Sequence, residues 1–129
     1  KPEAGWAHWD TAAEALHGIK REVLVDHGRS VTDVAIEHNQ VLAGQITYSD
    51  GWVVDKPWLS QLFAAARQRM DFHLSPIELI LTEPQMDIWH KVKQTVESDL
   101  PVIRHRASHD AWIIQETFVR SRALASAPT

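Results

Sequence analysis

The stretch SVTDVAIEHNQVLAG, residues 30–44, most constrains the fold, because either a helix or a strand can be built from it. A helix is favoured because Ser30 is a good N-cap, Asp33 lies in the first turn and Gly44 is a natural stop. Between these ends the apolar residues recur at helical steps: Val31, Val34, Ala35, Val41 and Leu42. A strand has the weaker support of alternation at Val34 and Ile36 alone. We therefore predict a helix over residues 31–43, with a strand as the alternative.

Capping patterns predict helices in other parts of the chain. Thr11 and Glu14 form a capping-box pattern, and apolar residues then recur at helical spacing until Gly28. The sequence therefore predicts a helix from residue 11 to about residue 27, with Gly18 inside it. Three more helices are predicted after the caps Asp55, Thr82 and Ser108, the first with Pro57 in its opening turn.

Short β-forming runs predict a small sheet. In QITYSDGWVVD the turn residues Asp50 and Gly51 separate two such runs, which indicates a β-hairpin at 46–54 with Tyr48 facing Val53. The apolar run at 77–82 predicts a buried strand, and VIRHR at 102–106 a short one. The predicted fold class is α+β: a single domain of four to five helices packed on a small sheet that includes the hairpin.

The length of 129 residues suits one domain. We expect a Trp-bearing N-terminal arm at 1–10, a globular domain at 11–124 and a flexible tail at 125–129. The chain has no cysteine, which excludes disulfides and thiolate metal sites and suits a reducing compartment, so we expect a cytoplasmic location. No apolar run is long enough for a transmembrane helix, so we expect a soluble protein without a membrane partner.

Six tryptophans are a high load for a chain of this length. Trp6 and Trp9 precede the first predicted helix, in a segment with no element of its own. Such residues either pack back onto the core or anchor a partner, and both alternatives stay open here. The other four, which lie on element faces, are predicted to be core: Trp52, Trp58, Trp89 and Trp112.

A DNA-binding regulator is one alternative function. Residues 31–48 loosely resemble a helix-turn-helix, with small Ala35 where the helices would touch and Asn39 at the turn. The segment 40–48 has no Lys or Arg to meet phosphates, and residues 1–60 hold five basic against nine acidic residues. If nucleic acid is bound, the better contact residues lie later in the chain: Arg67, Arg69, Arg104 and Arg106.

A His-based metal-dependent enzyme is the other alternative. In HRASHD, His105 and His109 are four residues apart and Asp110 follows, so one helical turn could present them to zinc. A cap at Ser108 would leave His105 outside the helix and spoil that geometry. The sequence also lacks the glutamate that follows the first histidine in HExxH zinc hydrolases. We therefore expect no cofactor, with zinc at these residues as the alternative.

No other catalytic pattern supports an enzyme. The sequence contains no G-x-S-x-G elbow, no P-loop and no G-x-G-x-x-G. Apolar and aromatic residues are plentiful by comparison. We therefore expect a non-enzymatic interaction module, an accessory, regulatory or assembly protein whose partner is another protein or a second copy of the chain, and whose anchors are Trp6 and Trp9.

Overall fold

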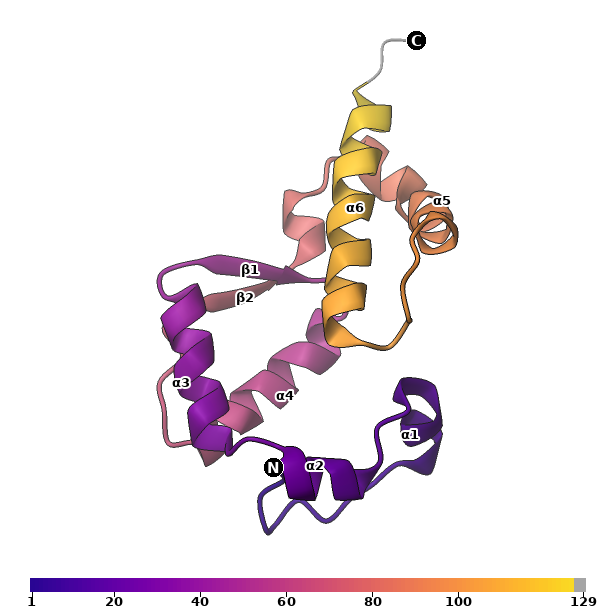
Figure 1. Ribbon diagram of the computed structural model, residues 1–129. Helices are drawn as coiled ribbons and strands as arrows, with labels where there is room; N and C mark the ends of the chain where they lie inside the picture. The colour runs from indigo at the N-terminus through magenta and orange to yellow at the C-terminus, as the bar shows by residue number, and fades with distance from the viewer. Residues whose placement is uncertain (127–129) are drawn as a thin grey trace. The chain divides into compact units, whose positions relative to one another are not determined.

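The computed structural model describes residues 1–126 and confirms the α+β class. In this part of the chain, six α-helices accompany one two-stranded sheet (Figure 1). The contacts divide the chain into two compact units, Lys1–Ile77 and the residues from Glu78 onward. That residues 11–124 form a single domain stays a prediction.

The first unit contains four helices and both strands. In chain order these are α1 (Thr11–His17), α2 (Arg21–His27), α3 (Val31–Leu42), β1 (Ile46–Ser49), α4 (Trp52–Ala65) and β2 (His73–Pro76). A short 3-10 helix, η1 (Ile77–Ile80), spans the boundary. The second unit contains α5 (Glu83–Asp99) and α6 (Ala107–Ala125).

The stretch at residues 30–44 contains a helix, as predicted. The Ser30 hydroxyl accepts a hydrogen bond from the Asp33 amide at 3.1 Å and so caps α3. Gly44 lies beyond the helix in the left-handed conformation, with φ of 72°. The strand alternative is wrong, because the local capping signals at both ends favour the helix.

The helix predicted over 11–27 is divided into α1 and α2. Gly18 ends α1 with φ of 66°, a conformation that glycine adopts without steric cost. The cap of α1 is also one residue earlier than predicted, because the Asp10 carboxylate accepts from the amides of Ala12 and Ala13. The sequence did not indicate this break, because apolar residues recur at helical spacing on both sides of Gly18.

The predicted β-hairpin at 46–54 is wrong. β1 pairs in parallel with β2, and Tyr48 lies opposite Ser75 rather than Val53. Residues 52–54 open α4 instead, so this helix begins before the predicted cap Asp55, and Pro57 lies inside it. The sheet is therefore the two strands of a β-α-β unit, in which α4 connects β1 to β2.

Side chains around the start of α4 explain why the chain enters a helix there. The Ser49 hydroxyl donates to the Asp55 carboxylate and accepts a hydrogen bond from the Gly51 amide at 2.9 Å. The Trp52 indole donates to the Leu74 carbonyl at 2.8 Å. Asp55 thus serves the turn into the helix, and Trp52 ties the first turn of α4 to β2.

The helix-turn-helix predicted at 31–48 does not form. α3 continues through Asn39, where the turn was predicted, and the segment that would read DNA contains β1. Asn39 instead bridges to the end of the α4–β2 connection. Its side-chain amide donates to the Arg69 carbonyl at 2.7 Å, and its carbonyl accepts from the Asp71 amide at 2.9 Å.

Replacing Asn39 with alanine is expected to lower the free energy of unfolding by about 1–2 kcal/mol, because two hydrogen bonds are lost at once. Asn39→Asp is the comparison variant, since it keeps the acceptor for the Asp71 amide but places a carboxylate oxygen against the Arg69 carbonyl. Urea unfolding of both variants measures the change. The bridge would have no structural role if Asn39→Ala left the free energy of unfolding unchanged.

The core of the first unit lies between α3 and α4. Five buried apolar residues form it: Val31, Ala35, Phe63, Ala66 and Phe72. The rings of Phe63 and Phe72 meet edge to face with centroids 5.8 Å apart. Trp6 of the arm packs against this cluster from outside.

The second unit is built on the packing of α5 against α6. Its buried apolar cluster comprises Val92, Val96 and Ile113. The Thr82 cap is confirmed, because Thr82 and Gln85 form a capping box at the start of α5. At the other end of α5, the Asp99 carboxylate accepts a hydrogen bond from Arg120 and raises the pKa of that guanidinium.

Other predictions for this unit are corrected. Residues 77–80 form η1 rather than a strand, and residues 102–106 are also not a strand. α6 begins at Ala107, so Ser108 lies inside the helix rather than at its cap. In the predicted tail, Ala125 ends α6 and residues 127–129 lie outside the described residues. No described helix is long and apolar enough to cross a membrane.

Candidate binding site

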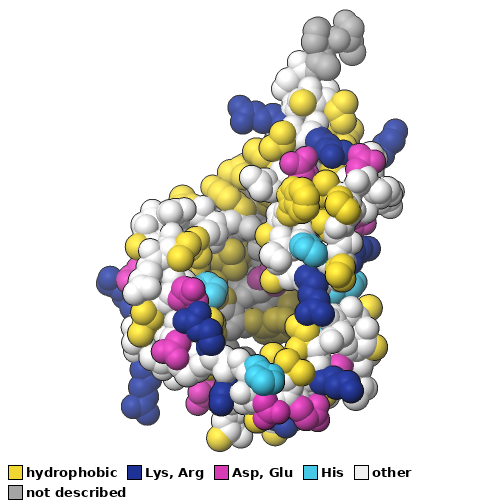
Figure 2. Space-filling model, in the orientation of Figure 1, with side chains coloured by type: hydrophobic (Ala, Val, Ile, Leu, Met, Phe, Trp, Pro, Cys, Tyr) yellow, Lys and Arg dark blue, Asp and Glu magenta, His cyan; other side chains and the backbone are white. Residues whose placement is uncertain are grey.

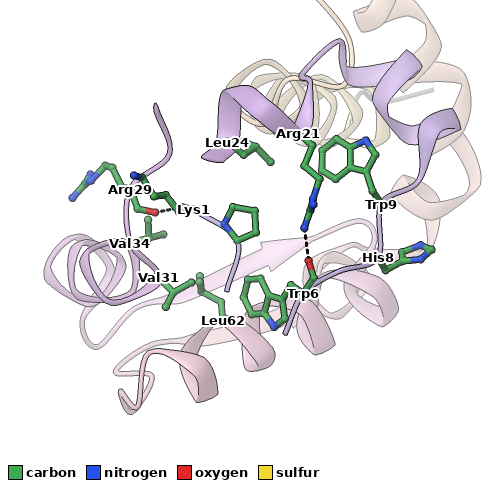
Figure 3. A pocket seen from close by; sticks show the side chains of 11 residues that line it. Lys1, Trp6, His8, Trp9, Arg21, Leu24, Arg29, Val31, Val34 and Leu62 are labelled. Atoms are coloured by element: carbon green, nitrogen blue, oxygen red, sulfur yellow. Dashed lines mark hydrogen bonds between the residues drawn. The ribbon is translucent and has the colours of Figure 1, made fainter. Parts of the chain in front are cut away.

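A cavity of about 310 Å³ lies in the first unit, between the N-terminal arm and the helices α2, α3 and α4. We call it the arm cavity (Figure 3). Its walls are mainly apolar and are formed by Trp6, Trp9, Leu24, Val31, Val34 and Leu62. A volume of this size lies at the lower end of the range for small-molecule sites.

Hydrogen bonds hold the arm in place over this cavity. The Trp6 amide donates to the Glu3 carbonyl at 2.9 Å, and the Trp6 carbonyl accepts from Arg21 Nη2 at 3.0 Å. The Trp9 indole donates to the Glu14 carboxylate at 2.5 Å. Both tryptophans are half-buried, and each therefore packs against its own unit while keeping a surface toward the cavity.

The charged residues of the arm cavity all have one sign. Lys1, Arg21 and Arg29 line it together with His8, and no Asp or Glu is among its described lining residues. Residues 1–60 contain only five basic residues against nine acidic ones, and three of those five meet here. Arg29 is paired with Glu37, whereas Arg21 makes no ion pair within the described chain. The cavity is thus positive in an otherwise acidic segment.

A second hollow, of about 460 Å³, lies next to the arm cavity and shares Trp6 with it. We call it the Trp58 hollow. The arm forms one wall and α4 the other, with Trp58, Gln61 and Leu62 contributed by the helix. Trp58 is 68% exposed, so the prediction that it is core is wrong. Trp6, His8 and Leu62 line both hollows, so the two meet at Trp6.

The other predicted core tryptophans differ in their burial. Trp89 is buried, as predicted, whereas Trp52 and Trp112 lie at the surface. Helical spacing alone does not distinguish the buried tryptophan from the exposed ones. It identifies the apolar face of a helix but not whether a neighbouring element covers that face. α4 shows this most clearly, since it carries apolar residues on all sides but has only Phe63 buried.

The four arginines predicted for nucleic acid do not gather into one basic patch within either unit. In the first unit Arg67 follows α4 with φ of 53°, and Arg69 pairs with Asp71 at 3.1 Å. In the second unit Arg104 pairs with Glu97 at 3.5 Å, and Arg106 precedes α6. Basic and acidic side chains also lie next to each other on the face shown in Figure 2. Such pairing reduces the positive field that phosphates require.

The predicted zinc ligands do not share a helical turn. His105 lies before α6, with φ of 64°, and its amide donates to the Asp110 carboxylate at 3.2 Å. His109 Nδ1 accepts from the Ile103 amide at 2.9 Å. Asp110 and His109 therefore hold the loop in front of α6. Within residues 1–126 no group of three or more His, Asp or Glu side chains is placed to hold a metal ion.

Comparisons with known proteins give no relative: no family model, no curated protein and no solved structure matches this chain.

Sequence patterns indicated Trp6 and Trp9 but missed Arg21, Arg29 and Trp58. For Trp58 a signal was present, because residues 56–70 contain Lys56, Arg67 and Arg69 and no acidic residue. An apolar stretch of this length without acidic residues is unusual for a surface that faces only water. For the two arginines no local signal exists, since only the fold brings them to the arm.

Proposed function

We propose that the first unit is a binding module that docks a segment of another protein in the Trp58 hollow. The observation that carries this proposal is the exposure of Trp58 beside Trp6. Tryptophan is enriched among the residues that contribute most of the binding energy of protein interfaces. Its contribution is largest when it lies in a concave position from which water is excluded. The partner-binding role predicted for Trp6 is retained, while Trp9 lines the arm cavity instead.

The helix face beside the hollow extends the apolar surface. Val54, Trp58 and Leu62 are spaced by four residues and therefore lie along one side of α4. Val54 and Trp58 are exposed, and Leu62 is half-buried under the arm. A stripe of this kind fits a partner segment that carries at least one large apolar side chain.

The charged residues near Trp58 indicate the charge of the partner segment. Lys56 lies in α4 two residues before Trp58, Arg67 follows the end of the helix, and no acidic residue lies between them in the sequence. Acidic side chains in a partner segment would complement the basic residues of this stretch. We therefore propose an acidic peptide segment with a large apolar residue as the occupant. The lack of cysteine suits the reducing cytoplasm, where we expect this interaction to occur.

Nucleic acid is the competing occupant, since bases can stack on exposed tryptophan next to basic residues. The ion pairs of Arg29 and Arg69 leave fewer cations to contact successive phosphates, which favours a protein segment. Docking of this kind needs no catalytic group, in keeping with a non-enzymatic module.

Selection from a displayed library of short random peptides tests the proposal. We expect selection on the wild-type protein, with counter-selection on Trp58→Ala, to enrich peptides that combine acidic residues with an aromatic or large aliphatic one. A synthetic copy of such a peptide should bind Trp58→Ala about tenfold more weakly or worse, measured by fluorescence anisotropy. Trp112→Ala, which removes another exposed tryptophan from the second unit, should bind it like the wild type.

Three results would overturn the proposal. The first is that no peptide depends on Trp58. The second is that a single-stranded oligonucleotide binds through Trp58 with a steep salt dependence, which would make nucleic acid the occupant. The third is a concentration-dependent dimer that Trp58→Ala abolishes, which would make the occupant a second copy of the chain.

A further inference from the structure

Arg21 is an unusual residue in the arm cavity, because its charge is not balanced by an acidic neighbour. The side chain reaches from α2 toward the arm, where Nη2 donates to the Trp6 carbonyl (Figure 3). This is its one hydrogen bond in the described chain, although a guanidinium has five N–H groups to donate. Arg21 is half-buried, and the apolar walls around it include Trp6, Trp9 and Leu24.

A cation in such surroundings favours the binding of an anion. Partial burial weakens its hydration, and the cavity offers no carboxylate in exchange. Since the Trp6 carbonyl occupies only one N–H, the remaining donors can bind a carboxylate while the arm stays attached. A planar carboxylate matches the fork of a guanidinium better than a point charge does.

We propose that the arm cavity binds the carboxylate of a small amphipathic acid, with Arg21 holding the carboxylate and the tryptophan-lined walls holding its apolar body. The volume of about 310 Å³ limits the ligand to a small organic acid or the last residue of a peptide chain. Both sources share one chemistry: a single carboxylate next to an aromatic or aliphatic group.

Arg29 also lines the cavity, as does Lys1, and the charge of Arg29 is partly neutralised by its pairing with Glu37. Both members of that pair are more than half exposed, and Glu37 is not a lining residue. Removing the Glu37 charge would therefore leave the cavity walls unchanged and make the Arg29 charge available. A variant without the Glu37 charge is therefore expected to bind the carboxylate more tightly, whereas a variant without the Arg21 charge is expected to bind it more weakly.

Carboxylate binding in the arm cavity is separate from the docking of a partner segment, because it concerns a different cavity and a different ligand. Trp58 lines only the Trp58 hollow, and Arg21 only the arm cavity. Failure of one proposal can therefore be told from failure of the other: Trp58→Ala tests the first and leaves carboxylate binding as in the wild type.

The test is calorimetric titration with phenylpropionate, with its neutral amide as the matched probe. We expect the acid to bind at concentrations up to about 5 mM and the amide to bind at least about tenfold more weakly. A second pair of probes, acetyl-alanyl-phenylalanine and its C-terminal amide, identifies the source. Tighter binding of this dipeptide acid than of phenylpropionate indicates a peptide C-terminus, and the reverse indicates a free organic acid.

Variants connect binding to Arg21. Arg21→Gln should weaken phenylpropionate about tenfold or more, and Glu37→Gln should strengthen it about two- to threefold. If Arg21→Gln does not fold, the Glu37→Gln comparison decides alone, since that residue lies outside the cavity. The proposal is overturned if neither acid binds, if acid and amide bind alike, if folded Arg21→Gln binds like the wild type, or if Glu37→Gln does not strengthen binding.

Discussion

Replacing Phe63 with alanine is expected to lower the free energy of unfolding by about 3–5 kcal/mol. Phe63 is 3% exposed and is the buried residue of α4. Its ring packs against Phe72, and the cluster around it joins α4 to α3. Truncation would remove most of the apolar contact that holds α4 in place, so the loss includes both the transfer term and the cavity left behind.

The measurement is urea unfolding, combined with hydrogen exchange of the α3 and α4 amides as a local readout. Phe63→Leu is the control, because it keeps most of the volume and should cost well under half as much. Equal effects of leucine and alanine would indicate that the ring itself contributes little. A loss below about 1 kcal/mol for alanine would contradict the described core.

The second large effect is expected at Ile113, the apolar residue of α6 that is most deeply buried, at 1% exposed. Ile113→Ala should cost about 2–5 kcal/mol. The second unit has only two other residues in its buried apolar cluster, Val92 and Val96 of α5. A small cluster cannot redistribute the lost contacts, so we expect a value in the upper part of that range.

Hydrogen exchange of the α5 and α6 amides, together with urea unfolding, measures this effect. Ile113→Val removes one methylene and should cost about 0.5–1.5 kcal/mol. Trp112→Ala is the surface control on the same helix, because Trp112 is exposed whereas its neighbour is buried. If the Trp112 variant were as unstable as Ile113→Ala, the described face of α6 would be wrong.

Signals that act over a few residues predicted the starts of two helices correctly. Ser30 and Thr82 cap α3 and α5 as expected, because their partners lie three residues away in the sequence. Asp50 and Gly51 likewise turn the chain. The element after that turn could not be determined locally, since the partner of β1 lies beyond α4 and is joined to it only by the fold.

In the candidate site, too, some residues could be recognised from the local sequence and others only from the fold. The tryptophans of the arm were recognisable because they stand outside any predicted element. Arg21 and Arg29 were not, because each resembles an ordinary helix-flanking residue until the arm is placed beside it. The exposure of Trp58 depends on which side of α4 faces α3, and helical spacing does not contain that information.

The parallel pairing of β1 with β2 also bears on the order of folding. Antiparallel strands can be joined by a two-residue turn, whereas this pair meets only after the chain has passed through the whole of α4. The entropy of closing that loop is lost before any strand hydrogen bond is gained. The buried residues that join α3 to α4 lie about as far apart in the sequence as the paired strand residues, since Ala35 and Phe63 are 28 residues apart and Ile46 and His73 are 27. Strand pairing and the packing of α4 against α3 therefore close loops of similar length, and we expect them to form together, with the Asn39 bridge completing the connection.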